Sequence, residues 1–350
     1  MNPQEEIMEN MLINSWVRHF LPAPYQANKP HQSDAELIEL PQDPQHYLAV
    51  TIDTVAEEIS LGLYQEATTM GWVTVMASLS DLAAVGANPL GIVISTSVEP
   101  DRDTEFINKI ARGMESACRM ADTYILGGDT NLTSTISLTG CAIGLVPKNK
   151  VMRRYGCKSG DIVFTTGGMG IGNALAMQKI THLADSLESD YRPVARLKES
   201  QLIREYASSC MDSSDGLLAT LDQLMRLNGL GFEIDYHWQQ ILAPKALEFC
   251  NRTRTPYWWM LGGLHGEFEL VFTIPAHKKD DFLTIAQSKS IIPIQLGKVQ
   301  ESTEISLTLA SQRKIVIDTT TIRNLLYTVG GDWQTLIQEF KNLTKKWGLQ

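Results

Sequence analysis

The feature that most constrains this chain is a set of aspartates placed in segments that are otherwise apolar or small. Asp81 stands in the middle of "ASLSDLAAVGANPLGIVIST", and the pattern returns in "YLAVTIDTVAE", "YILGGDTNL" and "CMDSSDGLLATL". A carboxylate in such surroundings is costly to bury unless it is paired or bound to a metal ion. The fold therefore has to explain all of them together: Asp53, Asp81, Asp129, Asp212 and Asp215.

Size, charge and cysteine content restrict the class of protein. The chain has 350 residues, 43% hydrophobic and 20% charged, which is enough for two ordinary domains. A formal net charge of -10 argues against nonspecific binding to nucleic acid or to an anionic membrane. Five scattered cysteines without a CxxC pair indicate reduced thiols. The start, "MNPQEEIMENMLINSW", lacks the features of a signal peptide, so we expect a cytoplasmic protein.

Apolar periodicity and glycine positions predict strands and helices that alternate along the chain. Several connections are too short for a uniform parallel sheet, which favours two α+β domains over a doubly wound fold. A charged segment, "PKNKVMRRYGCKSGD", separates the expected domains, 1–147 and 148–350. The predicted helices are 5–20, 67–86, 103–122, 169–180, 215–229, 278–289 and 331–348, and the predicted strands are 47–55, 90–99, 124–130, 134–146, 161–168, 231–236, 267–275 and 291–299.

The aspartates beside glycine or at element boundaries allow two interpretations. Asp215 could be the N-cap of the helix that follows it, and Asp129 could be a turn residue after two glycines. Asp81 has a weaker structural explanation, because aspartate is unfavourable inside a helix. Taken jointly, a shared site for Mg²⁺ and a polyphosphate is the simpler hypothesis, since hard cations prefer oxygen ligands.

Two further patterns could contact phosphate. The basic residues Lys150, Arg153, Arg154 and Lys158 form the densest positive cluster, and they are either a solvated linker face or a phosphate clamp. The stretch "TTGGMGIGNALA" follows a strand and opens a helix, but it lacks the GK[ST] ending of a Walker A loop. Neither pattern decides the function by itself.

Several motifs, in order, resemble those of thiamine-monophosphate kinases, in the superfamily of aminoimidazole ribonucleotide synthase. They are "SDAELIELP", "LAVTIDTVAEE", "SLSDLAAVGANPLG", "YILGGDTN", "VMRRYGCKSGDIVFTTGGMG", "YRPVAR", "MDSSDGLLATL" and "EFELVFTIP", and they span residues 30–300. The resemblance implies two α+β domains, with the N-terminal sheets of two subunits forming a barrel-like homodimer. It implies transfer of the γ-phosphoryl group of ATP to thiamine monophosphate. That acceptor phosphate is already an anion, so in-line positioning and charge neutralisation by Mg²⁺ and arginine suffice.

The same resemblance implies roles for individual residues. It places the metal-binding aspartates at Asp34, Asp53, Asp81, Asp129 and Asp215. Asp129, Asp215 and Arg154 would be catalytic. Nucleotide contacts would come from Arg154, Ser214, Gly128 and Thr130, and acceptor contacts from Glu57, Glu267 and Trp333. Trp333 has an alternative role as a core aromatic of the last helix.

Departures from the family pattern cluster on the acceptor side. Ser33 replaces the first of two usual aspartates, and Glu267 stands where the family has an aspartate. The usual Gly, His and Phe after the first strand become Glu58, Ser60 and Leu61. Three hypotheses follow: a thiamine-monophosphate kinase, a relative with the same ATP–Mg²⁺ site and another small acceptor, or a dimeric nucleotide-binding protein without catalysis.

Overall fold

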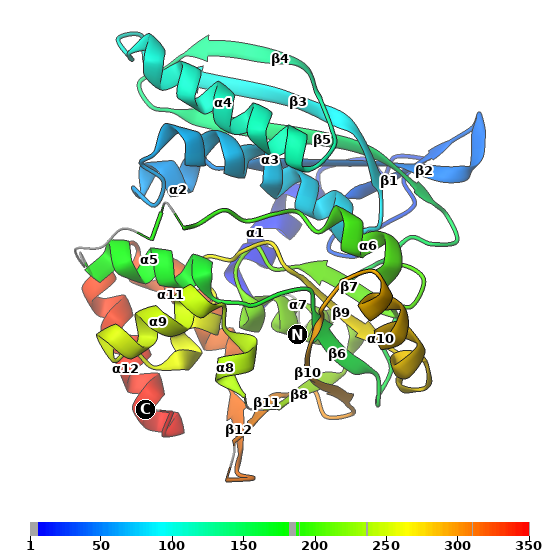
Figure 1. Cartoon of the computed structure of the whole chain (residues 1–350), viewed down its shortest axis with the longest axis vertical. Helices are drawn as coiled ribbons and strands as arrows, with labels where there is room; N and C mark the ends of the chain where they lie inside the picture. The colour runs from blue at the N-terminus through cyan, green and yellow to red at the C-terminus, as the bar shows by residue number, and fades with distance from the viewer. Residues whose placement is uncertain (1–5, 182–186, 189, 236, 310, 350) are drawn as a thin grey trace.

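Two β-sheets organise the chain, which we describe from a computed structural model (Figure 1). The structure describes residues 6–181, 187–188, 190–235, 237–309 and 311–349. The ends of the predicted domains, at residues 1 and 350, lie outside these ranges. Both units mix helices with largely antiparallel sheets, so the predicted α+β class is confirmed.

The first sheet has the strand order β1-β2-β5-β3-β4, and only β3 and β4 pair in parallel within it. Its strands run from residue 36 to residue 147. Burial alternates strictly along β5, so one face of the sheet is covered and the other is not. The strands are β1 (Glu36–Leu40), β2 (Asp43–Thr54), β3 (Asn88–Val98), β4 (Ile125–Leu132) and β5 (Ser137–Pro147).

The second sheet has the order β12-β11-β8-β10-β6-β9-β7, with β8 and β11 parallel. Its edge strand β7 ends at an aspartate that faces the first unit. The strands are β6 (Ile162–Thr165), β7 (Ser209–Asp212), β8 (Gly231–Asp235), β9 (Leu270–Ile274), β10 (Ile294–Gln300), β11 (Ile305–Thr308) and β12 (Lys314–Ile317).

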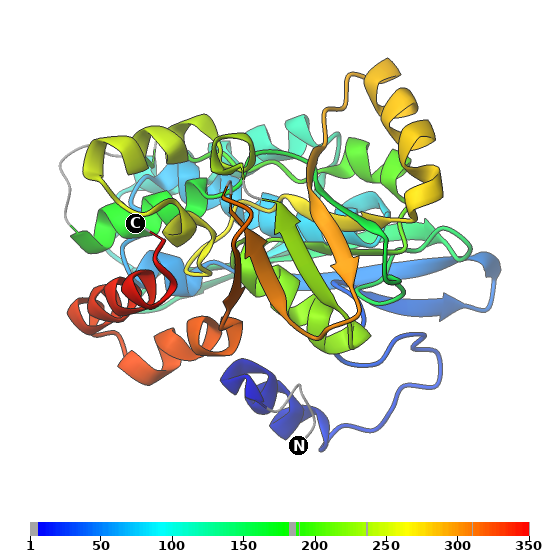
Figure 2. The ribbon, with the colours of Figure 1, turned by 90° about the horizontal axis from the view of Figure 1, so that it is seen from below.

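Helices cover the inner face of the first sheet and surround the second. In Figure 2, α1 near the N-terminus lies beside α11, and the backbone N–H of Met8 donates to Oδ1 of Asn324 over 2.9 Å. The helices are α1 (Met8–Val17), α2 (Ala56–Ser60), α3 (Ala67–Ala84), α4 (Thr104–Met120), α5 (Ile171–Thr181), α6 (Leu197–Ile203), α7 (Leu217–Asn228), α8 (Trp238–Ile241), α9 (Pro244–Thr253), α10 (Lys279–Ser288), α11 (Thr319–Val329) and α12 (Trp333–Trp347), with 3₁₀ turns η2 (Tyr257–Leu261) and η3 (Ala276–Lys278).

Helix α3 lies between the two units and is buried along almost its whole length. Its residues are apolar or small all round, which is typical of a helix without a solvent face. It crosses α4 at two glycines, where added side chains would collide: a Cβ on Gly71 would lie 2.0 Å from the Ile110 carbonyl oxygen, and one on Gly113 would lie 2.2 Å from that of Thr68. This close contact with α4 fixes the position of α3, and hence that of Asp81, relative to the second unit.

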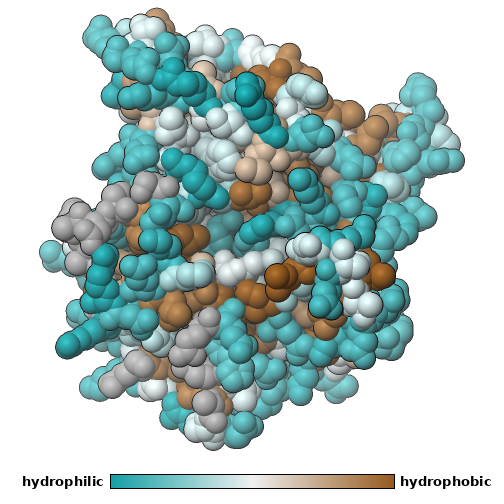
Figure 3. All heavy atoms as spheres, viewed as in Figure 1, coloured by the Kyte–Doolittle hydropathy of each residue, from teal (hydrophilic) through white to brown (hydrophobic). Residues whose placement is uncertain are grey.

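The outer face of the first sheet is open to solvent. All eight residues of β4 are exposed. Large apolar side chains protrude from this face and from its edge, and hydrophobic atoms are visible over these strands at the top of Figure 3. They include Ile52, Leu90, Val93, Leu126 and Leu132.

The predicted helices at 67–86, 103–122, 215–229 and 331–348 are confirmed as α3, α4, α7 and α12. Asp103 caps α4 through the backbone N–H of Glu105, as expected. Helix α11 and the short strands β1, β7, β11 and β12 were not predicted. Within the described residues, no helix combines the length and apolarity needed to cross a membrane.

Candidate active site

Three carboxylates from distant parts of the sequence meet at the seam between the two units. One oxygen from each of Asp34, Asp81 and Asp212 lies within 4.8 Å of the others. Asp34 precedes β1, Asp81 lies in the last turn of α3, and Asp212 ends β7. Three ionised carboxylates at such distances repel strongly, so the arrangement calls for a cation between them.

Neighbouring side chains hold this triad in place without neutralising it. Thr51 donates to Asp81, and Ser80 donates to Asp212 over 2.7 Å. The guanidinium of Arg154 binds one oxygen of Asp34 through Nη2 at 2.9 Å and Nε at 3.2 Å. One positive charge therefore faces several negative ones.

Two buried carboxylate oxygens near the triad have no hydrogen-bond partner in the described part of the chain. They are Oδ2 of Asp34 and Oδ2 of Asp53, which lies beside Asp81. Unsatisfied buried acceptors are costly, and a divalent cation with oxygen ligands is the group that would satisfy them. The donor set of this structure thus fits Mg²⁺.

The pKa values agree with a missing positive charge. Burial raises the pKa of Asp81 well above its ordinary range, and the nearby Asp53, Asp212 and Asp34 raise it further. The pKa of Asp212 is also raised by burial and by Asp34, and that of Asp53 is raised to about 6 by burial. A bound cation would lower all three pKa values.

A pocket of about 470 Å³ lies close to the triad, since it is lined by Asp215, three residues after Asp212, and by Glu58, whose pKa the charge of Asp53 raises. It brings together three of the predicted site residues, Asp215, Glu57 and Trp333. Asp215 does not cap α7, because Gly216 occupies the N-cap position and no side chain caps the helix, so that alternative is wrong. Trp333 is the first residue of α12 and lines the pocket.

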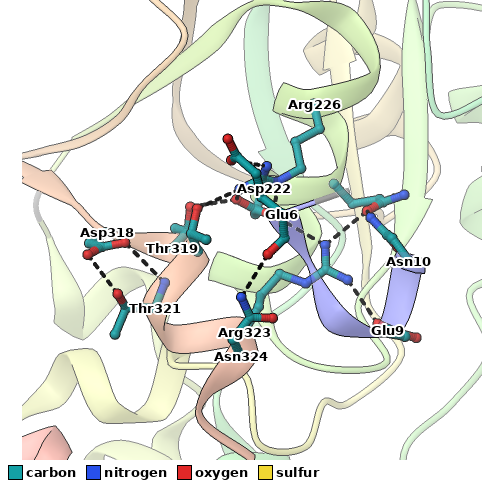
Figure 4. Close-up of polar contacts among 12 residues, drawn as sticks. Glu6, Glu9, Asn10, Asp222, Arg226, Asp318, Thr319, Thr321, Arg323 and Asn324 are labelled. Carbon is teal, nitrogen blue, oxygen red and sulfur yellow. Dashed lines mark hydrogen bonds and ion pairs between the residues drawn. The ribbon is translucent and has the colours of Figure 1, made fainter. Parts of the chain in front are cut away.

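The chain ends form one wall of this pocket. Arg323 of α11 binds Glu9 of α1 at 2.9 Å and the buried Asp222 of α7 at 3.1 Å (Figure 4). Thr319 also donates to Asp222, over 2.6 Å. This polar network joins the N-terminal helix to the C-terminal helices at the rim of the pocket.

The pocket carries a net negative charge. Its acidic lining residues are Glu9, Glu57, Glu58 and Asp215. The two basic lining residues are already paired: Lys179 with Glu188 at 2.9 Å, and Arg323 with Glu9 and Asp222. A cationic ligand would therefore be favoured over a neutral one.

Other predicted residues lie elsewhere. Asp129, with Gly128 and Thr130, lies within β4, so Asp129 is not a turn residue. It pairs with the exposed Ser95, whereas the buried Ile94 beside it pairs with Gly128. Since adjacent strand residues alternate between faces, Asp129 points to the open face of the sheet, away from the triad.

Glu267 is buried at the start of α5 rather than in the pocket. Its Oε2 accepts a hydrogen bond of 2.6 Å from the backbone N–H of Gly170, in the glycine-rich turn. Because the N–H groups at this turn already donate to Glu267, they are not free to bind a phosphate. The residue before Glu267, Gly266, donates its backbone N–H to the carbonyl oxygen of Ser214. Ser214 itself follows the end of β7 and precedes the pocket residue Asp215.

The basic cluster is divided between two roles. Arg154 turns inward to Asp34, whereas Lys150 forms an ion pair with Glu205 on the surface. The solvated-face interpretation therefore holds for Lys150 and not for Arg154.

Comparison with known proteins defines the class. The description "AIR synthase related protein, N-terminal domain" matches residues 32–146, and "AIR synthase related protein, C-terminal domain" matches residues 158–310. Together these matches cover all three triad residues and nearly all of both sheets, β12 lying beyond residue 310. The chain is thus built from the two domains of the aminoimidazole ribonucleotide synthase superfamily.

Within that class, the chain belongs to the thiamine-monophosphate kinase family. It is 31% identical to the thiamine-monophosphate kinase of Archaeoglobus fulgidus over 246 residues, covering 69% of this chain and 77% of the relative. It is 29% identical to that of Escherichia coli K12, covering 69% and 75%. The fold is similar to that of AaThiL complexed with AMPPCP and TMP, with a TM-score of 0.72, 20% identity, and coverage of 90% and 96%.

Proposed function

We propose that this protein is an ATP- and Mg²⁺-dependent kinase that phosphorylates thiamine monophosphate to thiamine diphosphate. The observation that carries the proposal is the convergence of Asp34, Asp81 and Asp212 beside an acidic pocket. Membership of the family and the likeness to AaThiL complexed with AMPPCP and TMP support the same activity.

The triad would hold Mg²⁺, with Asp53 as a further ligand through its unpaired oxygen. When bound, the metal supplies neutralisation of the phosphate charge during transfer. Arg154 would orient Asp34 and present its remaining donors to the polyphosphate. By resemblance, Ser214 and Asp215 would lie next to the transferred group, between the triad and the acceptor pocket.

The acceptor would bind in the 470 Å³ pocket, where negative charge suits the thiazolium cation of thiamine. Glu57, Glu58 and Glu9 supply that charge, and Trp333 supplies an aromatic face. Glu267 would act indirectly, by fixing the start of α5, whose Lys179 lines the same pocket.

We further infer a cytoplasmic homodimer in which a second copy covers the open face of the first sheet. The five cysteines are all free thiols, and a large apolar face on a single chain is typical of an interface. Gly128, Asp129 and Thr130 are proposed as nucleotide or metal contacts on the strength of the resemblance. Their strand is fully exposed, so such contacts would form in the assembled dimer.

A second candidate function is phosphorylation of a different cationic acceptor. It is favoured by Glu58, which places a carboxylate where the family has glycine, and by the pocket wall formed by Glu9 and Arg323. The metal site would be shared by the two candidates, and the acceptor alone would differ.

The deciding experiment incubates the protein with ATP, Mg²⁺ and thiamine monophosphate and follows thiamine diphosphate and ADP by chromatography. Equal amounts of both products are expected. ADP formed only with another cationic phosphate would favour the second candidate. ATP binding without any product would contradict a catalytic role.

Asp81→Asn provides the matched control for this assay. We expect at least a ~100-fold loss of turnover, since the substitution removes a proposed metal ligand. In Mg²⁺-free buffer the same variant should melt at a higher temperature than the parent, because one repulsive charge is gone. A lower melting temperature would mean that Asp81 is a structural group and would contradict its assignment as a ligand.

A further inference from the structure

A second cavity lies on the far side of the helices that line the acceptor pocket. It has a volume of about 770 Å³ and is enclosed by α5, α9, the residues after α9, η2 and α12. We propose that this cavity is a second anion-binding site, which takes the phosphate or diphosphate group of a small organic molecule. All of α12 lies beyond the part of the chain that the family descriptions match.

Four basic residues surround the cavity, and no described acidic residue lines it. They are Arg252, Arg254, Lys341 and Lys345. The side chains of Arg254, Lys341 and Lys345 make no hydrogen bond or ion pair with any described residue. In a chain with 40 acidic and 30 basic residues, pairing partners are abundant. A hollow bordered by Arg254, Lys341 and Lys345, the three cations without such a partner, therefore attracts anions.

Helix stabilisation explains only part of this arrangement. Arg252 and Lys345 lie in the last turns of α9 and α12, where positive charge favours the helix C-terminus. Lys341 lies in the interior of α12. Arg254 follows α9 in a left-handed conformation with φ of 58°, a position that glycine adopts most easily. Lys341 therefore serves neither helix end, and Arg254 caps α9 through its backbone N–H, which donates to the carbonyl oxygen of Cys250, rather than through its guanidinium.

The floor of the cavity is rigid and apolar. Trp259 and Ile337 line it, and the indole N–H groups of Trp258 and Trp259 both donate to Thr344, over 3.0 and 2.9 Å. Such a floor suits a flat or apolar body, while the arginine and lysine rim suits phosphate oxygens. The two features together indicate an organic phosphate rather than a bare inorganic anion.

The proposal is tested by calorimetric titration of the full-length protein with inorganic pyrophosphate in buffer with a chelator. Without metal, the acidic triad repels this probe, so binding reports on the basic cavity. We expect one pyrophosphate per chain and an affinity that falls as salt is added. The double variant Arg254→Glu/Lys341→Glu should lower the affinity at least ~10-fold.

Lys346→Glu is the matched control, since Lys346 is exposed on the same helix and does not line the cavity. It should bind pyrophosphate as the parent does. An equal loss in the control and the double variant would reveal a general charge effect and overturn the proposal, as would unchanged binding in the double variant. All variants should keep the parental melting temperature.

A second titration, with thiamine diphosphate, distinguishes the sources of the phosphate group. Tighter binding than pyrophosphate, lost in the double variant, would show that the apolar floor contributes and that the ligand is organic. Equal affinities for thiamine diphosphate and pyrophosphate would contradict the proposal that the ligand is an organic phosphate, and the site would then bind inorganic diphosphate.

Discussion

At the scale of single residues, Glu58 is the group whose environment bears most directly on acceptor choice. Its Oε2 is buried and has no hydrogen-bond partner among the described residues. Burial raises the pKa of Glu58 to about 7, and the charges of Glu57, Asp215 and Asp53 raise it further. Glu58 therefore loses its negative charge as the pH falls through the physiological range. A cation in the pocket would lower its pKa and so keep the side chain charged.

We expect Glu58→Gln to raise the KM for thiamine monophosphate about 10-fold, a loss of about 1.4 kcal/mol, with kcat within about 2-fold. Because a pKa of about 7 leaves the parent side chain uncharged at lower pH, the parental KM should rise as pH falls from 8 to 6. The variant should show a shallower rise, because Asp215 in the same pocket, with a pKa of about 6, still titrates. Steady-state kinetics over this pH range is the measurement.

Glu57→Gln is the comparison for that prediction. Glu57 lines the same pocket but is exposed, so solvent screens its charge and its loss should change KM by no more than about 2-fold. Equal effects of the two substitutions, or a pH profile unchanged by Glu58→Gln, would contradict a specific role for Glu58.

Single residues also show what the sequence could and could not reveal about the site. The resemblance pointed to Asp34 and Asp81, which the structure brings together. Asp212 has the same lone position in "CMDSSDG", yet the resemblance assigned the ligand role to Asp215, three residues later. Which of the two faces the triad depends on the end of a four-residue strand, and local pattern does not determine that.

At the scale of elements, the crossing of α3 and α4 places the metal site. Gly71 and Gly113 let the two helix backbones approach until any side chain would meet a carbonyl oxygen. The same α3 contributes Ser80 and Asp81 to the seam between the units. A shift of the crossing would therefore move the triad as well as the core.

We expect Gly113→Ala to destabilise the fold by about 2 kcal/mol or more, although alanine is the better helix former by about 1 kcal/mol. The Cβ would lie 2.2 Å from the Thr68 carbonyl oxygen, so the helices have to separate. Denaturant unfolding measures the effect. Ser116→Ala, at an exposed position of α4, should change stability by less than about 0.5 kcal/mol. A stabilised Gly113→Ala variant would contradict the crossing geometry.

Long periodic elements were predictable and short ones were not. Helix α4 has a polar face and a clear N-cap at Asp103, so both its identity and its start could be read from the sequence. Strands β7, β11 and β12 have four residues each, too few for alternation to emerge. Their place in the sheet is decided by pairing with distant strands.

At the scale of the whole molecule, the most notable surface is the open face of the first sheet, where large apolar side chains are exposed to solvent. Ile52 of β2 is 69% exposed and Val93 of β3 is 38% exposed, and both lie on this face because each pairs with Cys141 of β5. A fully exposed edge strand beside an apolar face is a liability for an isolated chain. The two-sheet architecture could be predicted from the sequence through its resemblance, whereas the covering of this face by a second copy stays a prediction.

We expect the protein to be a dimer at micromolar concentration and Ile52→Lys to be largely monomeric, because the substitution buries a charge in the proposed interface. Analytical ultracentrifugation distinguishes the species, since one chain has a mass of 38.9 kDa. Ile292→Lys is the control, as Ile292 is 82% exposed and lies outside the first sheet. A monomeric parent protein would contradict the assembly.

The link between the chain ends through Glu9 and Arg323 has a consequence for how this enzyme could diversify. The triad residues lie within the two family domains, whereas α1, α11 and α12 lie outside them and form one wall of the acceptor pocket. One wall of the acceptor pocket is thus encoded apart from the metal site, although Glu57, Glu58 and Asp215 line the pocket from within the family domains. Changes at the two ends could retarget the enzyme while the phosphoryl-transfer machinery is inherited intact.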